Sequence, residues 1–126
     1  MTDWKSRPLD PATVDWDSPQ VASYKFRQDP GPHNALGLVR INMPNKHSVY
    51  MHDTPLKRLF GQSARAFSSG CVRVEKVFEL AAWLLGPQKG WTLEKVEAQI
   101  ESGKKIDAKL AQPVPVHFVY LTAFAG

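Results

Sequence analysis

Apolar and polar positions along the chain predict helices most clearly in its second half. Over residues 74–85 the apolar side chains recur at the spacing of one helix face, and Gly86 followed by Pro87 supplies a stop. This apolar stripe consists of Val77, Phe78, Ala81, Leu84 and Leu85. Trp83 is expected to pack in the core and Trp91 at the junction with the next helix.

A second helix is predicted over residues 93–102. Thr92 is a suitable N-cap, and Glu94 lies in the first turn, where a carboxylate interacts favourably with the helix dipole. Gly103 supplies the end of this helix. Its apolar stripe consists of Leu93, Val96 and Ile100.

Alternating and β-branched segments predict strands on both sides of the helices. A turn at residues 44–47 joins two of these strands into a hairpin, and the last strand is expected to be central in its sheet. The predicted strands cover residues 21–28 (with clear alternation from 24), 38–43, 48–52, 104–110 and 116–124. Strands and helices together predict an α+β domain that is mainly β.

Other stretches of the chain carry no such period. Residues 1–20 contain three prolines and are predicted to form an extended arm, in which Trp4 and Trp16 indicate packing against another part of the molecule. Pro55 opens one short helical turn. Residues 61–73, which contain the cysteine, are predicted to be irregular.

Length and composition bound the class of protein. The chain has 126 residues, 43% hydrophobic and 22% charged, which suits one globular domain and excludes fibrous and wholly disordered proteins. No apolar run approaches the roughly 20 residues of a transmembrane helix. The charged, proline-containing start differs from a signal peptide.

The net charge of +4 suits an anionic partner such as an acidic wall polymer, a membrane surface or nucleic acid. Because basic and acidic residues are interleaved along most of the chain, nucleic-acid binding is not expected. The single cysteine, Cys71, excludes an internal disulfide and a multi-cysteine zinc site.

The segment S-S-G-C-V-R (68–73) and His52 carry the candidate chemistry. A thiol needs an activating neighbour, and a histidine can accept its proton and later return it to an amine. His52 ends a predicted strand nineteen residues before Cys71, so the loop between them can fold back. Gly70 permits a tight turn that aims backbone N–H groups at an oxyanion. From spacing alone, an inert buried cysteine remains the commoner alternative.

The remaining histidines and one basic pair receive structural interpretations. His33 is expected in a solvated loop and His47 in an exposed turn. His117 is expected as a core or edge histidine of the last strand. Lys57 and Arg58 are expected on a solvated face.

Several segments together resemble the YkuD-type L,D-transpeptidase catalytic domain, most closely its large periplasmic subgroup with a substrate-capping lid. The similarity runs from about residue 28 to residue 85 and resumes at 114–124. The motifs that carry it are H-N-A-L-G (33–37), Y-M-H-D-T-P (50–55), L-F (59–60), R-A-F-S-S-G-C-V-R-V (65–74) and L-A (80–81).

The resemblance implies an L,D-transpeptidase-like β-sandwich with one or two packed helices. Residues 1–126 would form a single catalytic domain, with residues 1–30 as a lid-adjacent arm and residues 31–126 as the catalytic core. Because several strands precede the matching segment in that family, the sheet is expected to lack its opening strands.

The resemblance also implies a peptidoglycan cross-linking enzyme of the periplasm or cell envelope. The thiolate would attack the diaminopimelate carbonyl of a donor stem tetrapeptide and release D-alanine, and an acceptor amine would resolve the thioester. No metal or organic cofactor is implied, and carbapenem β-lactams are expected to acylate the same thiol. Two alternatives remain open: a truncated, inactive domain that binds peptidoglycan or another protein, and a cysteine amidase or carboxypeptidase in which water resolves the thioester.

The family's functional residues map onto one histidine and the cysteine loop. Cys71 would be the nucleophile and His52 the general base and acid. The backbone carbonyl of Asp53 would orient the imidazole ring, and Gly70 and Cys71 would donate backbone N–H groups to the oxyanion. Arg73 would hold the active-site loop or a substrate carboxylate.

Four further residues are candidate substrate contacts: Tyr50, Ser68, Ser69 and Asn34. Tyr50 shares a strand face with His52, and it either lines the substrate groove or packs. The two serines precede the cysteine, but neither has a base of its own. Asn34 either binds the substrate backbone or forms an Asx-type turn.

Overall fold

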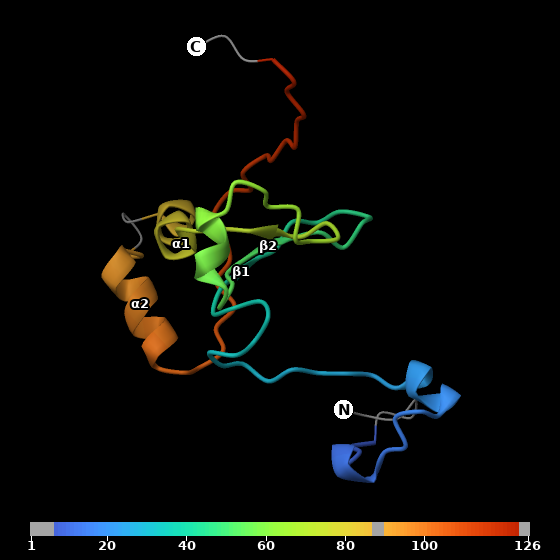
Figure 1. The fold of residues 1–126 in the computed structure, drawn as a ribbon. Helices are drawn as coiled ribbons and strands as arrows, with labels where there is room; N and C mark the ends of the chain where they lie inside the picture. The colour runs from blue at the N-terminus through green and yellow to red at the C-terminus, as the bar shows by residue number, and fades with distance from the viewer. Residues whose placement is uncertain (1–6, 87–89, 124–126) are drawn as a thin grey trace.

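The computed structural model describes residues 7–86 and 90–123 of the chain. Within these ranges one small mixed sheet lies beside two helices, which is consistent with the predicted mainly-β α+β fold (Figure 1). The elements are the strands β1 (Arg40–Ile41), β2 (Met51–His52) and β3 (Val72–Arg73), the helices α1 (Val77–Leu85) and α2 (Leu93–Glu101), and the 3-10 helices η1 (Pro11–Thr13), η2 (Pro19–Ser23) and η3 (Lys57–Gly61).

The sheet has the strand order β1, β2, β3. β1 and β2 are antiparallel, with Arg40 opposite His52, so the predicted hairpin is confirmed. β3 runs parallel to β2, with Arg73 opposite His52. His52 therefore lies on the central strand with a fixed neighbour on each side.

The two hairpin strands are shorter than predicted because the side chain of Asn45 replaces part of the ladder between them. Its Oδ1 accepts hydrogen bonds from the amides of His47 (3.0 Å) and Val49 (3.2 Å). Its Nδ2 donates to the carbonyls of Met43 and Val49, both at 2.6 Å. Ser48, with φ +55°, completes the turn, and His47 is exposed as predicted.

The strand β3 lies in a stretch predicted to be irregular. Its two residues carry no period of their own, and hydrogen bonds to the β2 segment define the strand. The amide of Val72 donates to the carbonyl of Tyr50 (3.0 Å), and that of Val74 donates to the carbonyl of His52 (2.9 Å). The second bond keeps Val74 in the sheet, which explains why α1 begins only at Val77.

The main buried apolar cluster lies between α1 and α2. Ala81 and Ala82 on α1 face Val96 on α2, and all three are buried. Partly buried side chains surround them: Val39, Phe78, Trp91 and Ile100. Because Val39 directly precedes β1, this cluster joins the helix pair to the sheet.

Trp83 is wrongly predicted to be a core residue. Its side chain is 67% exposed, because Ala81 and Ala82 lie on the inward face of α1 and Trp83 lies outside it. Trp91 packs against the core cluster beside α2, as predicted.

The predicted N-cap of α2 and the predicted stops of both helices are confirmed within the described residues. The hydroxyl of Thr92 accepts a hydrogen bond from the amide of Lys95 (3.3 Å), and Gly103, with φ +66°, follows α2. Gly86 has φ +88° at the end of α1, and Pro87 lies outside the described residues. Neither helix of the described chain is long and apolar enough to span a membrane.

The strand predicted over residues 21–28 is absent. Pro19 opens η2, whose first turn is capped by Ser18, so this part of the arm is a 3-10 turn followed by extended chain. The arm runs away from the sheet (Figure 1), so it has no ladder partner there.

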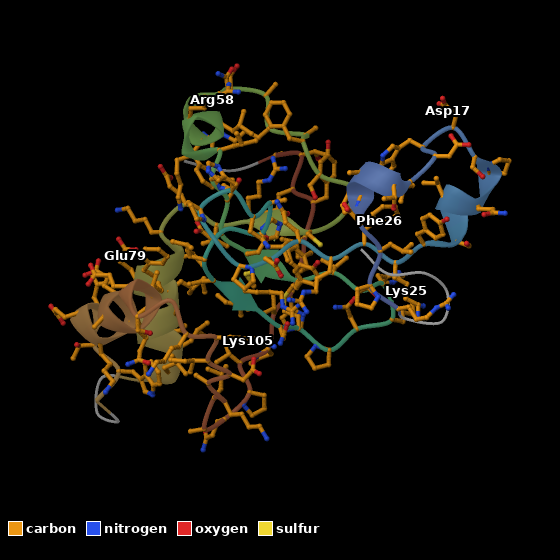
Figure 2. The ribbon with its side chains drawn as sticks, turned by 90° about the horizontal axis from the view of Figure 1, so that it is seen from below. Asp17, Lys25, Phe26, Arg58, Glu79 and Lys105 are labelled. Atoms are coloured by element: carbon orange, nitrogen blue, oxygen red, sulfur yellow. The ribbon has the colours of Figure 1, made fainter. Side chains whose placement is uncertain are left out.

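The two aromatic side chains of the arm contact each other. Trp16 stacks on Phe26 with a centroid distance of 6.4 Å, and both remain more than half exposed. Figure 2 labels Phe26 in this arm, near Asp17 and Lys25. Trp16 therefore packs within the arm, and Trp4 lies outside the described residues.

The strands predicted over residues 104–110 and 116–124 are also wrong. Residues 104–123 are exposed and form no strand, and Figure 1 shows the end of this segment leading away from the sheet. Aromatic and β-branched residues favour strands only where a neighbouring strand can pair with them. Tyr120 is accordingly 91% exposed, and His117 is an exposed residue instead of a core histidine.

The N-cap of α2 gives a direct test of this fold. We expect Thr92→Ala to lower the free energy of unfolding by about 1 kcal/mol, because the Lys95 amide loses its acceptor. Thr92→Ser keeps the hydroxyl and should retain most of the stability. Urea denaturation of the three proteins measures the difference, and equal losses in both variants would contradict the cap.

Candidate active site

The ring of His52 is held in place on the central strand. The residue is 5% exposed, and its Nδ1 is in hydrogen-bond contact with the backbone carbonyl of Asp53. Because a carbonyl only accepts hydrogen bonds, Nδ1 carries the proton in this contact. Nε2 is then the nitrogen that can accept a proton from another group.

The parallel pairing of β2 with β3 brings the cysteine beside this histidine. Continuing the register by one residue from β3 sets Cys71 opposite Tyr50, which is two residues before His52. Alternate residues of a strand share a face, as do partners across a ladder. Cys71, which directly precedes β3, therefore lies at a position on the same sheet face as His52 on β2, and Cys71 is half-buried.

Cys71 also lines a pocket of about 280 Å³. This pocket lies between η3 and the chain that leads into β3. Its other lining residues are Thr54, Leu59, Phe60, Arg65, Phe67, Ser68, Val72 and Arg73. His52 is not among the lining residues, so the pocket reaches the candidate site from the cysteine side.

The loop before the cysteine is exposed and tightly turned. Gly70 has φ +156°, and a Cβ there would lie 3.3 Å from Val49, so both conformation and space favour glycine. Its amide donates a hydrogen bond to Oγ of Ser68 (3.2 Å). This amide is one of the two N–H groups expected to face an oxyanion, so one of the two is already engaged. The amide of Cys71 makes no hydrogen bond within residues 7–86 and 90–123. Ser69 is exposed beside them.

Two arginines flank His52 across the sheet. Arg40 on β1 and Arg73 on β3 are its direct neighbours in register, so the three positions share one face. Nε of Arg73 is buried and has no hydrogen-bond partner among the described residues. The Arg40 guanidinium lies 5.3 Å from the ring centre of Tyr50, whose ring meets that of His52 edge-on at 6.0 Å. The chain thus sets two cations beside the candidate base.

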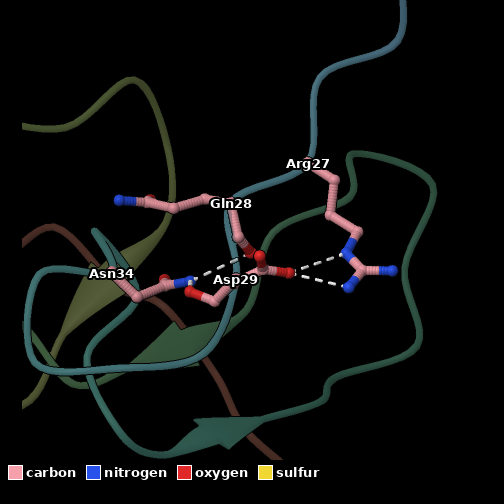
Figure 3. A network of polar contacts seen from close by, with 4 residues as sticks. All are labelled: Arg27, Gln28, Asp29 and Asn34. Carbon is pink, nitrogen blue, oxygen red and sulfur yellow. Dashed lines mark hydrogen bonds and ion pairs between the residues drawn. The ribbon is translucent and has the colours of Figure 1, made fainter. Parts of the chain in front are cut away.

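The side chain of Asn34 is used within its own loop. Its Nδ2 donates to the carbonyls of Asp29 (3.0 Å) and Gln28 (3.4 Å), and its Oδ1 accepts from the amide of Leu36 (2.8 Å). Figure 3 shows this amide beside the ion pair of Arg27 with Asp29. The Asx-type turn is present, and a substrate contact of Asn34 stays a prediction.

The sequence patterns miss the side-chain partners of Asp53. Its carboxylate is buried, accepts a hydrogen bond from the Leu38 amide (3.0 Å) and forms an ion pair with Lys57. Lys57 and Arg58 are both exposed, as predicted, and the ion pair of Lys57 with the buried Asp53 carboxylate is the feature that the sequence did not predict. The four-residue spacing does not by itself indicate this pair, because Asp53 lies outside η3 and the spacing rule applies within one helix.

The charge state of Asp53 follows from these contacts. Burial by itself raises the pKa of this carboxyl group. Hydrogen bonds from Lys57 and from two backbone amides, together with the charge of Lys57, outweigh burial and hold the pKa below 3.8. Asp53 is therefore an ionised buried carboxylate at neutral pH. Among the described residues, no group of three His, Cys, Asp or Glu side chains could hold a metal ion.

Comparisons with known proteins give a matching family and a relative for this chain. Residues 2–116 match the YkuD family, the L,D-transpeptidase catalytic domain. The chain is 42% identical over 117 residues to a protein of Haemophilus influenzae named "Putative L,D-transpeptidase". That alignment covers 92% of this chain and 24% of the relative, so the chain spans about a quarter of the relative's length.

Gly37 tests the packing around Asp53. A Cβ at Gly37 would overlap the Asp53 side chain, and φ is +61°. We expect Gly37→Ala to lower the free energy of unfolding by clearly more than about 1 kcal/mol. Gly103→Ala is the matched control, since Gly103 has φ +66° with open space around it. Equal losses in thermal denaturation would contradict the close packing against Asp53.

The depressed pKa of Asp53 predicts a pH dependence of stability. Its stabilising contribution is fully present above the unfolded-state value near 3.8 and is lost as pH falls through the lower folded-state pKa. Asp53→Asn lacks this contribution. The stability gap between wild type and variant should therefore be widest near neutral pH, and in urea denaturation it should close as pH falls below 3.8 and through the lower folded-state pKa of Asp53. A constant gap would contradict the assignment.

Proposed function

The chain belongs to the YkuD family of L,D-transpeptidase catalytic domains, and we propose that it transfers acyl groups between peptidoglycan stem peptides with Cys71 as the nucleophile. The relative is named only for the family activity, so the substrate and the residue roles belong to this proposal. The observation that carries it is the β2–β3 register, because Cys71 directly precedes β3 at a position on the same sheet face as His52.

In the first step His52 activates the thiol. With Nδ1 donating to the Asp53 carbonyl, Nε2 takes the proton of Cys71, and the thiolate attacks the diaminopimelate carbonyl of a donor tetrapeptide. A C–S bond forms, the C–N bond to the terminal D-alanine breaks, and His52 returns the proton to the leaving amine. The products are a thioester on Cys71 and free D-alanine.

Backbone and charged groups would stabilise this step. The Cys71 amide donates to the tetrahedral oxyanion, because it makes no hydrogen bond within the described chain. The Gly70 amide can join it only after leaving Ser68. Arg73, whose Nε is buried without a hydrogen-bond partner in the part of the chain that the structure describes, would bind a carboxylate of the stem peptide. Arg40 lies on the other side of His52 for a second contact.

In the second step an acceptor amine resolves the thioester. His52 accepts a proton from the attacking amine, a new amide bond forms, and the thiolate leaves and is protonated. The product is a direct cross-link between two stem peptides, so the reaction belongs to the periplasm or cell envelope, where peptidoglycan lies. Residues 31–126 would supply this core, with residues 1–30 as the lid-adjacent arm.

Acylation by a carbapenem tests the nucleophile and its base. Attack of Cys71 opens the β-lactam ring, so intact-mass spectrometry should show one added drug mass. Cys71→Ala should show none, and His52→Gln should acylate at least about a hundredfold more slowly, because the general base is lost. His47→Gln is the matched control, since His47 lies in the exposed hairpin turn.

Four outcomes would contradict the proposal. An adduct on Cys71→Ala would exclude Cys71 as the nucleophile, and an unchanged rate in His52→Gln would exclude His52 as the base. Wild-type protein that forms no adduct but still sediments with peptidoglycan would favour the inactive binding domain. With tetrapeptide substrates, shortened stems without dimers would instead indicate resolution by water.

A further inference from the structure

Asp53 joins the candidate base to groups that belong to other elements. Its backbone carbonyl is in hydrogen-bond contact with Nδ1 of His52, and its side chain forms an ion pair with Lys57 on η3. We propose that Lys57, acting through Asp53, is a positioning residue that sets the ring orientation of His52. The inference rests on the proposed role of His52 as the base of Cys71.

Backbone and side-chain contacts clamp Asp53 on both sides of the carbonyl that His52 uses. The Asp53 amide donates to the carbonyl of Val39 (2.8 Å), and its Oδ2 accepts from the amide of Leu38 (3.0 Å). Its Oδ1 binds Nζ of Lys57. The peptide that carries the carbonyl joins Asp53 to Thr54, and the Thr54 backbone contributes a further hydrogen bond to the Asp53 carboxylate, so this peptide has little freedom to rotate. The His52 ring then inherits this fixed direction through Nδ1.

Lys57 is itself held from a second side. Its Nζ lies 5.8 Å from the ring centre of Phe78 on α1, within reach of a cation–π contact. Phe78 packs against the core between the two helices. The contacts therefore run from the helix core through Lys57 and Asp53 to His52.

The ion pair between Asp53 and Lys57 also favours a fixed position of the Asp53 carbonyl. The Asp53 side chain is 4% exposed, whereas that of Lys57 is half exposed. A buried carboxylate left without its cation costs free energy, and the chain relieves this by moving the carboxylate toward water. Such a movement would rotate the Asp53 carbonyl away from Nδ1. Loss of Lys57 should thus disturb the base even though Lys57 lies outside the reacting groups.

The inference goes beyond the motif that identifies the family. That motif assigns only the backbone carbonyl of Asp53 to His52 and gives Lys57 no role. The structure adds a named cation, and it makes the adjacent Arg58 a natural comparison, because Arg58 has the same charge on the same 3-10 helix and is exposed.

Alkylation of Cys71 by iodoacetamide measures the pairing without any peptidoglycan substrate. Cys71 is the only thiol, so mass spectrometry reports its rate directly. We expect Lys57→Met to slow alkylation at pH 7 by about tenfold or more, because a displaced base no longer takes the thiol proton. At about pH 10 a thiol ionises without help, so the variant and the wild type should react alike. Arg58→Met should match the wild type at both pH values.

A merely structural role for Lys57 predicts a different result. Lys57→Met would then lower the thermal midpoint but leave the ratio of the rates at pH 7 and pH 10 unchanged, and this outcome would overturn the inference. Lys57→Arg keeps the cation and should restore most of the rate at pH 7. Failure of this rescue in a variant with wild-type melting would also count against the positioning role.

The same data separate this inference from the proposed function. If the wild-type thiol reacts at pH 7 no faster than free cysteine and His52→Gln leaves that rate unchanged, the pairing of His52 with Cys71 is wrong and the inference fails with it. If His52→Gln slows the reaction and Lys57→Met does not, only the role of Lys57 is wrong.

Discussion

The parallel pairing of β2 with β3 is the contact on which the candidate site depends. Two backbone hydrogen bonds, from Val72 to Tyr50 and from Val74 to His52, hold the segment after the cysteine against the strand of the histidine. Cys71 lies nineteen residues after His52 in the sequence, and this short ladder brings the two segments side by side. A slip of the register by one residue would turn the cysteine to the other face of the sheet.

Around this pairing the chain concentrates its buried polar residues. His52, Asp53 and Thr54 follow one another at the end of β2, and each is at most 5% exposed. Buried polar groups are tolerated when they have partners, and Asp53 has them on three sides. Gly37 leaves the space that this carboxylate occupies. The candidate site thus consists of the buried polar residues 52–54 beside the exposed loop that precedes Cys71.

Local signals predicted what depends on neighbours in the sequence. The two helices, the Thr92 cap and the hairpin are confirmed, because spacing, capping and turn residues act within a few positions. The strand β3 was missed, because only its partner defines it. The strand predicted over residues 116–124 was wrong for the converse reason. Its residues favour a strand by type, but no neighbouring strand pairs with them in the described chain.

In the candidate site, too, the sequence predicted what a local motif determines and missed what the fold brings together. The motif predicted the contact between His52 and the Asp53 carbonyl, and that contact is present. Arg40 was missed because its position beside His52 comes from the hairpin register, and Gly37 because its neighbour lies sixteen residues along the chain.

The exposed segment that follows α2 has a consequence for how the protein behaves in solution. Phe118, Val119 and Leu121 are each more than 60% exposed, and their backbone forms no strand in the described chain. Such a stretch is a template for intermolecular β-pairing, so self-association should rise with protein concentration. Pro113 and Pro115 interrupt the stretch on one side, and the net charge of +4 adds repulsion between molecules. At low ionic strength the two prolines and the net positive charge therefore both oppose self-association.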